Sequence, residues 1–240
     1  MDFVEVFSSI QGEGKYAGYR QVFVRLAGCN LACDYCDTPA SRRATIAGQV
    51  EATPGGRDFF PVANPVTPDV LAGHVNNLLR FPHHSVSLTG GEPLCQPAAV
   101  AALAPQLNGK VYLETNGTLP DELAAVLPHV AIVAMDIKLP STSGREWWEE
   151  HDRFLRLAAA RDVFVKVVLT AATTDDEFRR AMALVAAVDR RIPVVLQPVS
   201  PVNNVAGIAP EAVLKLLAAA LDILDDVRVI PQTHKMMGQL

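Results

Sequence analysis

The sequence predicts an α/β protein built as a partial (β/α)6 barrel. From residue 67 onward, short apolar runs rich in β-branched residues alternate with longer helical segments. This alternation is typical of a parallel sheet covered by helices. About six such units follow one another, fewer than the eight of a complete barrel. With 240 residues, half of them hydrophobic, the chain can form one core, so we expect a single domain over residues 1–240.

The elements are expected in the following order. Residues 3–24 predict two short strands, an N-terminal hairpin around a glycine-rich turn. Residues 40–66, broken by glycine and proline, predict an irregular loop insert with room for a short hairpin. Thr67 followed by Pro68 predicts the start of a helix that runs to about Phe81. Strands are then expected at 85–89, 110–114, 131–136, 163–169, 193–196 and 227–230, and helices at 97–107, 121–127, 147–160, 174–188 and 210–224.

Charge and composition narrow the class of protein. The net charge of −5 argues against a nucleic-acid-binding surface. No apolar run approaches the length of a membrane span, and the N-terminal segment lacks a basic region followed by an apolar one. We therefore expect a cytoplasmic protein without a membrane partner. Thiols stay reduced in that compartment, so clustered cysteines indicate a metal site rather than disulfides.

Three of the four cysteines lie in the segment CNLACDYC, directly after the apolar run 22–26. Cys29, Cys33 and Cys36 have C-x3-C-x2-C spacing, and three thiolates on one loop can hold a four-iron cluster that leaves one iron open. A structural zinc site prefers four closed ligands, and the next cysteine, Cys95, is far along the chain. A zinc-stapled binding module is the alternative interpretation. We expect Cys95 to be a buried bystander rather than a partly ionised thiol.

Polar segments follow the predicted strands at the end where active sites form in parallel barrels. These segments are TGGEP from Thr89, ETNG from Glu114, DIK from Asp136, Gln197-Pro198, and QTHK with His234 after the last strand. Arg25 alternates with apolar neighbours, so it either lines the barrel, where it would suit an anionic substrate, or lies at the surface. The remaining histidines are expected at the surface or as caps: His74, His83, His84, His129 and His151.

The cysteine loop and TGGEP together resemble the radical S-adenosylmethionine (SAM) superfamily. The resemblance implies a TIM-like partial barrel and a [4Fe–4S] cluster held by Cys29, Cys33 and Cys36, with SAM at the open iron. Tyr35 matches the aromatic position that packs near the adenine. A glycyl-radical enzyme activating protein is a second alternative within this superfamily, although the QGEG loop and the QTHK tail would be unexpected in it.

The complete set of motifs is more specific. QGEG, CNLACDYCDT, TGGEP, ETNG, DIKxPS with Ser141, LQPVSP and QTHK resemble the 7-carboxy-7-deazaguanine synthase family. The resemblance implies conversion of 6-carboxy-5,6,7,8-tetrahydropterin to 7-carboxy-7-deazaguanine with release of ammonia, in queuosine and 7-deazapurine biosynthesis. It also implies a homodimer, the cofactors SAM and Mg²⁺, and an electron donor such as flavodoxin or ferredoxin.

The same resemblance implies a role for each matching residue. Thr38 would bind Mg²⁺ through its hydroxyl. The residues around SAM would be Tyr35, Gly91, Glu92, Asn116, Asp136, Lys138 and Gln197. The residues around the pterin would be Gln11, Gly12, Glu13, Gly14, Arg25, Thr89, Glu114 and His234. We assign no catalytic acid or base, because SAM carries the chemistry. Many family members have Ser-Pro-Lys where this chain has Asp136-Ile137-Lys138, and the insert 40–66 matches no family motif.

Overall fold

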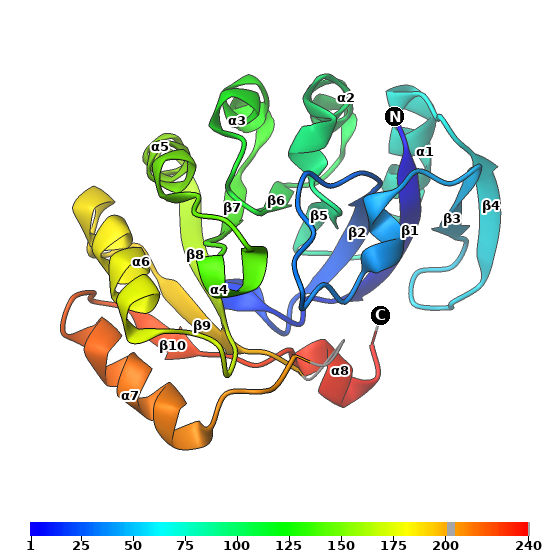
Figure 1. Ribbon diagram of the computed structural model, residues 1–240. Helices are drawn as coiled ribbons and strands as arrows, with labels where there is room; N and C mark the ends of the chain where they lie inside the picture. Colours follow the sequence, from blue (N-terminus) through cyan, green and yellow to red (C-terminus); the bar gives the residue numbers. More distant parts are fainter. Residues whose placement is uncertain (201–204, 240) are drawn as a thin grey trace.

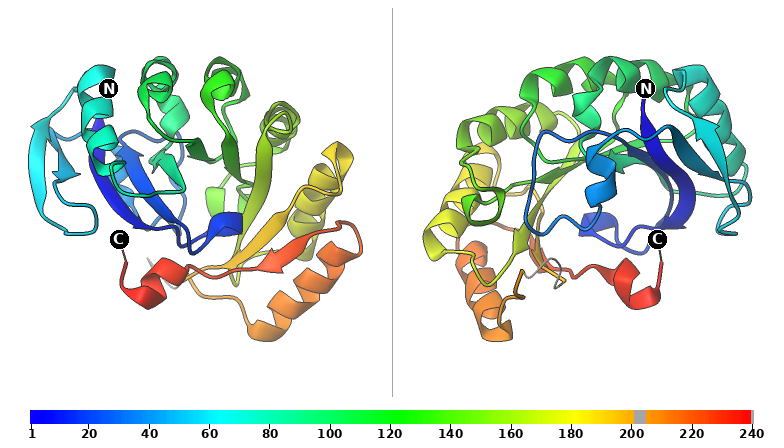
Figure 2. Two further views of the ribbon diagram at one scale, coloured as in Figure 1. Left: turned by 180° about the vertical axis from the view of Figure 1, so that it is seen from behind. Right: turned by 45° about the vertical axis from the view of Figure 1, so that its right-hand side comes forward.

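The computed structural model describes residues 1–200 and 205–239. Its centre is one ten-stranded sheet that curves like part of a barrel wall, with the longer helices on its outer face (Figures 1 and 2). The strand order is β10-β9-β8-β7-β6-β5-β2-β1-β3-β4. Within the described ranges the edge strands β10 and β4 do not pair, so the barrel is open. The prediction of a partial barrel is therefore confirmed.

The strands are β1 (Phe3–Ile10), β2 (Arg20–Leu26), β3 (Ala47–Glu51), β4 (Phe59–Ala63), β5 (Ser85–Gly90), β6 (Val111–Thr115), β7 (Ile132–Asp136), β8 (Asp162–Leu169), β9 (Val194–Pro198) and β10 (Val227–Val229). The α-helices are α1 (Pro68–Leu78), α2 (Pro97–Leu103), α3 (Pro120–Val126), α4 (Pro140–Ser143), α5 (Trp148–Ala158), α6 (Asp175–Val188), α7 (Pro210–Leu221) and α8 (Thr233–Met237).

Seven neighbouring strands, β2 and β5 to β10, pair in parallel, and β1 pairs antiparallel with β2. The main core lies between the sheet and the helices and includes Val22, Val24 and Leu26 of β2. A smaller apolar cluster around Tyr112 and Phe164 lies on the inner face. Because side chains alternate along a strand, the same strands supply both the outer core and the inner wall.

Local sequence signals explain where the helices begin. Thr67 caps α1, since its side chain accepts a hydrogen bond from the backbone N–H of Val70, and Pro68 is the first helical residue. At α6, Thr174 and Glu177 form a capping box. Each such cap contributes about 1 kcal/mol. The start of α1 is confirmed, although the helix ends at Leu78 rather than near Phe81.

The insert 40–66 is more regular than the sequence suggests. It contains the antiparallel hairpin β3–β4, and β3 pairs in parallel with β1, so the insert extends the sheet. Two short helices, α4 and α8, were not predicted. The second of these, α8, begins directly after Gln232. Pro201, the last residue of the LQPVSP motif, lies outside the described residues.

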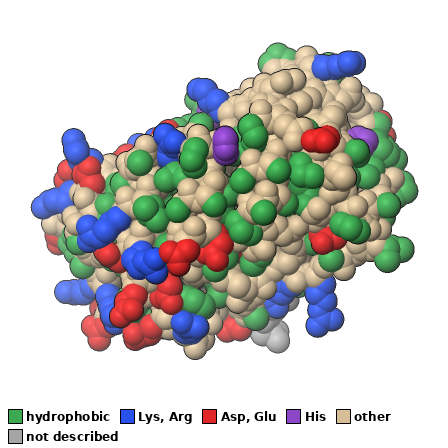
Figure 3. Space-filling view, turned by 90° about the horizontal axis from the view of Figure 1, so that it is seen from above, with side chains coloured by type: hydrophobic (Ala, Val, Ile, Leu, Met, Phe, Trp, Pro, Cys, Tyr) green, Lys and Arg blue, Asp and Glu red, His purple; other side chains and the backbone are tan. Residues whose placement is uncertain are grey.

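The outer surface carries charges of both signs. Seen from above, Lys, Arg, Asp and Glu side chains are interspersed over the side of α5 and α6, and they are sparser over the side of α1 and α2 (Figure 3). In the described part of the chain, no helix combines the length and the apolar character needed to cross a membrane.

Candidate active site

A cavity of about 230 Å³ lies inside the curve of the sheet, at the carboxyl ends of the parallel strands. It is lined by the cysteine loop, by residues 11–14 and by the polar segments that follow β5, β6, β7 and β9. Every residue expected around the cluster, Mg²⁺, SAM or the pterin lines this cavity, with the exception of Glu92. The structure thus brings together segments that are more than 200 residues apart, from Gln11 to His234.

The cysteine loop suits a metal cluster better than a single zinc ion. Cys29, Cys33 and Cys36 are partly buried reduced thiols that all line the cavity. Zinc would hold its sulfur ligands about 4 Å apart, from a tetrahedral Zn–S distance of about 2.3 Å. Among the residues that the structure describes, however, the three cysteines do not form a group whose ligand atoms all lie within 4.8 Å. The wider spacing argues against the zinc interpretation.

The TGGEP segment packs directly against the cysteine loop. A Cβ atom on Gly91 would lie 2.0 Å from the carbonyl oxygen of Gly28, so only glycine fits there. The next residue, Glu92, donates its backbone N–H to the same carbonyl at 2.7 Å. This contact explains the second glycine of the motif in physical terms, because the two backbones could not approach around a side chain.

Glu92 lies behind the cavity wall rather than in it. Its carboxylate is fully buried and accepts hydrogen bonds from Leu94 N (3.0 Å), Asn116 N (2.7 Å) and Thr115 Oγ1 (3.0 Å). Burial raises the pKa of Glu92 to about 7, against the lowering effect of these hydrogen bonds. In this structure Glu92 therefore ties the TGGEP segment to the ETNG segment, and a contact with SAM stays a prediction.

His151 has a corresponding role one strand further on, and the expectation that it is a surface or capping residue is wrong. The ring is fully buried. Its Nδ1 lies 3.0 Å from the carbonyl of Gly117, and its Nε2 lies 3.1 Å from the backbone N of Lys138. A carbonyl only accepts, so Nδ1 carries the proton and Nε2 accepts. Burial lowers the pKa of His151 to about 4, so the ring is neutral and joins the ETNG and DIK segments.

The residues expected around the pterin form a hydrogen-bonded group. Glu114 accepts from Gln11 Nε2 at 2.7 Å and from Thr89 Oγ1 at 3.0 Å. Arg25 lines the cavity, which decides between its two predicted positions. Its Nε donates to Glu5 Oε1 at 2.6 Å, and a guanidinium has further N–H donors for an anionic ligand.

Sequence reasoning missed Lys166, which lies in the middle of β8 and lines the cavity. Its Nζ contacts Glu13 Oε2 and lies 3.3 Å from Asp136 Oδ1, and Lys138 Nζ lies 2.7 Å from the other oxygen of Asp136. Burial would raise the pKa of Glu13, but Lys166 and a hydrogen bond from Gln232 lower it to about 2. A sequence signal for Lys166 was available: it lies between Val165 and Val167 of β8, which face the outer core, so its side chain faces the opposite side of the sheet.

A side chain of the SAM set has an unused acceptor. Oε1 of Gln197 is buried and has no hydrogen-bond partner within the described ranges, and the residue lines the cavity. Such an orphaned acceptor is costly unless a ligand donates to it. Lys138 and Tyr35 line the same cavity: Lys138 Nζ lies 5.3 Å from the centre of the Tyr35 ring, and burial raises the pKa of Tyr35 to about 12. The wall next to the cluster loop therefore fits a ligand with both polar and aromatic parts.

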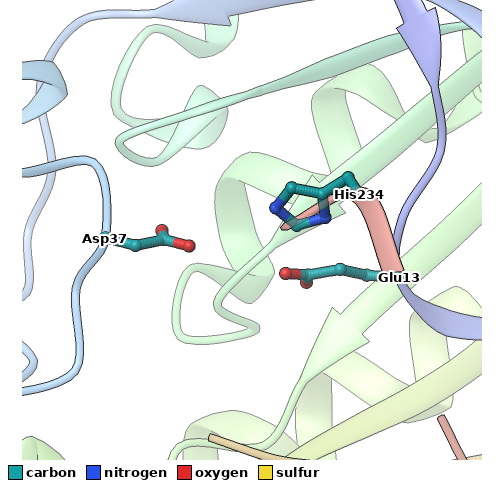
Figure 4. A group of neighbouring side chains, drawn as sticks. All are labelled: Glu13, Asp37 and His234. Atoms are coloured by element: carbon teal, nitrogen blue, oxygen red, sulfur yellow. The ribbon is translucent and has the colours of Figure 1, made fainter. Parts of the chain in front are cut away.

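Glu13, Asp37 and His234 point toward one another, with their ligand atoms within 4.8 Å (Figure 4). The two carboxylates already have partners, since Gln232 Nε2 donates to both, at 2.7 and 3.0 Å. Lys235 Nζ lies 2.9 Å from Asp37, and Lys166 holds Glu13. A metal ion here would have to displace two ammonium groups, so we assign none.

Cys95 also differs from the expectation. Its side chain is exposed rather than buried. Partial burial and nearby negative charges raise the pKa of its thiol to about 11, so it is not a partly ionised thiol either.

The comparisons with known proteins agree with this geometry. The model of the radical SAM superfamily matches residues 24–184. A curated protein of Geobacter sulfurreducens, named 7-carboxy-7-deazaguanine synthase, is 48% identical over 98% of this chain and 96% of its own length. The chain belongs to the 7-carboxy-7-deazaguanine synthase family. A second member of that family, from Methanothermobacter thermautotrophicus, is 36% identical, again over 98% of this chain and 96% of its own length.

A solved structure shows the same fold at lower identity. QueE from Escherichia coli aligns with a TM-score of 0.64 and 20% identity, covering 97% of this chain and 93% of that chain. As a radical SAM protein of the 7-carboxy-7-deazaguanine synthase family, the chain requires a [4Fe–4S] cluster and SAM. The predicted family is thereby confirmed, and the zinc-stapled module and the activating protein are set aside. The role of each lining residue is still a prediction.

Proposed function

We propose that this chain converts 6-carboxy-5,6,7,8-tetrahydropterin to 7-carboxy-7-deazaguanine and releases ammonia. The proposal depends on one observation. This chain is 48% identical to a protein named 7-carboxy-7-deazaguanine synthase, and the residues that match the motifs of that family, except Glu92, line one cavity. The product belongs to 7-deazapurine biosynthesis, including the queuosine pathway.

The cluster and SAM would occupy the side of the cavity formed by the cysteine loop. Cys29, Cys33 and Cys36 would hold the cluster, and the TGGEP, ETNG and DIK segments would surround SAM. When bound, these groups supply one-electron chemistry that begins by removing a hydrogen atom from the substrate. The chain's own contribution is placement and exclusion of water. Gln197 supports the SAM position, because its unpaired Oε1 can accept from an amino group of the ligand.

The pterin would occupy the side formed by residues 11–14 and Glu114. The carboxylates of Glu13 and Glu114 suit the N–H donors of its guanidine-like edge, and Gln11 holds Glu114 in position at 2.7 Å. Arg25 would pair with the substrate carboxylate through N–H groups not used by Glu5. Opposite charges at the two ends of the site would fix the orientation of the ring system.

Magnesium would bind at Thr38, which lines the same cavity. A hydroxyl oxygen is a suitable hard ligand, and oxygens of the substrate and water would complete an octahedron. Asp37 is beside it in sequence, but Lys235 already pairs with that carboxylate. We therefore keep Thr38 as the protein ligand. The active species would be a cytoplasmic homodimer that receives electrons from a donor such as flavodoxin or ferredoxin.

The test is anaerobic incubation of reconstituted protein with SAM, dithionite and carboxytetrahydropterin, followed by mass spectrometry. We expect the mass of 7-carboxy-7-deazaguanine together with ammonia. Cys33→Ala should lose the cluster and the product. Cys95→Ala is the matched control, because that exposed thiol does not line the cavity and the variant should keep both. Cluster-loaded wild-type protein that cleaves SAM without forming this product would contradict the proposal.

A further inference from the structure

Lys166 is a charged residue in the middle of β8, between the apolar residues Phe164 and Val168 on the same face of the strand. Its neighbours Val165 and Val167 are fully buried in the outer core, so alternation turns Lys166 toward the cavity, together with Phe164 and Val168. Lysine is rarely buried unless it is paired. Its presence on the inner wall therefore calls for an explanation beyond the fold.

The ammonium of Lys166 is shared by two carboxylates that belong to different parts of the site. It contacts Glu13 on one side and lies 3.3 Å from Asp136 on the other, and Lys138 follows Asp136 at 2.7 Å. The four side chains form a row of alternating charge, with exposed fractions from 11% to 20%. Water screens such charges poorly, so each carboxylate depends on its close counter-charge.

Lys166 is held in its charged form. Burial would lower its pKa, but the charges of Asp136 and Glu13 raise it above its ordinary value. Lys166 therefore stays protonated at neutral pH and does not act as a proton donor. What it can do is move between partners, because its Nζ pairs with both carboxylates and its 3.3 Å contact with Asp136 has room to shorten.

We propose that Lys166 is a positioning residue that couples the binding of the pterin to the binding of SAM. N–H donors of the pterin on Glu13 replace the ammonium there, and the ammonium closes on Asp136. Asp136 is then held in place by both ammonium groups and oriented toward the SAM ribose. This inference rests on the proposed function, which places the pterin at Glu13 and SAM at Asp136. By linkage, each ligand strengthens the binding of the other by the same factor.

The first experiment measures this factor by isothermal titration calorimetry on anaerobic, cluster-loaded protein without a reductant, so that no turnover occurs. In the wild type, SAM should lower the Kd of the pterin by roughly five-fold or more. In Lys166→Met, which keeps an unbranched side chain one atom shorter and removes the charge, the ratio should fall to about one. Lys215→Met is the control: this exposed lysine pairs with Asp175 on the outer surface, and the wild-type ratio should persist. Equal ratios in Lys166→Met and wild type would overturn the inference.

The second experiment leaves Lys166 in place and removes its first partner. In Glu13→Gln the ammonium belongs to Asp136 even without pterin, so SAM should bind the variant several-fold more tightly than it binds ligand-free wild type. Unchanged or weaker SAM binding by Glu13→Gln would also overturn the inference. This test remains decisive even if Lys166→Met does not fold. Iron content and circular dichroism establish that each variant is intact. Product formation by the wild type is measured on the same preparation, so a failure of the proposed function has its own readout.

Discussion

Replacing His151 by glutamine tests whether a neutral imidazole joins two segments of the active site. In the folded protein the ring is fully buried, and burial lowers its pKa from 6.5 to about 4. In the unfolded chain the ring titrates near its ordinary value. Below pH 6.5 the unfolded state therefore binds a proton that the folded state excludes, and the free energy of unfolding decreases as the pH falls.

The size of the effect follows from the pKa difference, since each pKa unit corresponds to about 1.4 kcal/mol. Between about pH 7.5 and about pH 5, the wild type should lose about 2 kcal/mol of stability through His151. Glutamine can donate to Gly117 and accept from Lys138 without titrating. The difference in unfolding free energy between wild type and His151→Gln should therefore change by that amount over this pH range.

The assay is anaerobic urea unfolding of both proteins at several pH values, followed by circular dichroism. His151→Leu provides a second comparison, because it leaves the carbonyl of Gly117 and the N–H of Lys138 without partners, at about 1–3 kcal/mol for each group. A stability difference between wild type and His151→Gln that stays constant with pH would refute the reasoning, because the ring would then titrate alike in both states.

Three further predictions concern residues of the cavity wall. Gly91→Ala should prevent SAM binding in a titration, because the added Cβ would lie 2.0 Å from the carbonyl oxygen of Gly28. Gly73→Ala in α1 is the control. A Cβ at Gly73 would have no atom within 4 Å, so this variant should raise the melting temperature slightly. Thr38→Ala should weaken the dependence of turnover on Mg²⁺ at unchanged iron content, and an identical Mg²⁺ titration would remove Thr38 from the site. Arg25→Lys should raise the KM for the pterin roughly ten-fold or more with kcat little changed, through loss of the planar guanidinium; an unaltered KM would show that Arg25 does not bind the substrate.

The sequence predicted the partial barrel correctly because its local signals agree with one another. The period of the apolar runs distinguishes strands from helices. Thr67 with Pro68 marks the start of α1, and the capping box at Thr174 marks the start of α6. The polar segments after the strands were also informative, since parallel strands bring their carboxyl ends to one edge. The hairpin β3–β4 was harder to assign to the sheet, because its pairing with β1 is set by contacts distant in sequence.

The supporting roles of three residues in the site could not be predicted from local sequence motifs. His151 lies on α5, and only the packing of that helix shows that its ring reaches Gly117 and Lys138. Lys166 occurs within a strand, so it belongs to no strand-end motif. Glu92 was found by its motif, yet its burial behind the wall depends on how Asn116 approaches it. These positions are set by tertiary packing rather than by local pattern.

The anchoring of the last helix against the first loop has a consequence for how the site is made. The backbone N–H of Thr233 donates to Gly12 at 2.9 Å, and Gln232 reaches Glu13 from the same side. One wall of the cavity thus consists of residues that lie more than 200 positions apart in the sequence. During synthesis, the segment around Glu13 leaves the ribosome long before its partners, so this wall of the cavity can close only once residues 232–235 have emerged.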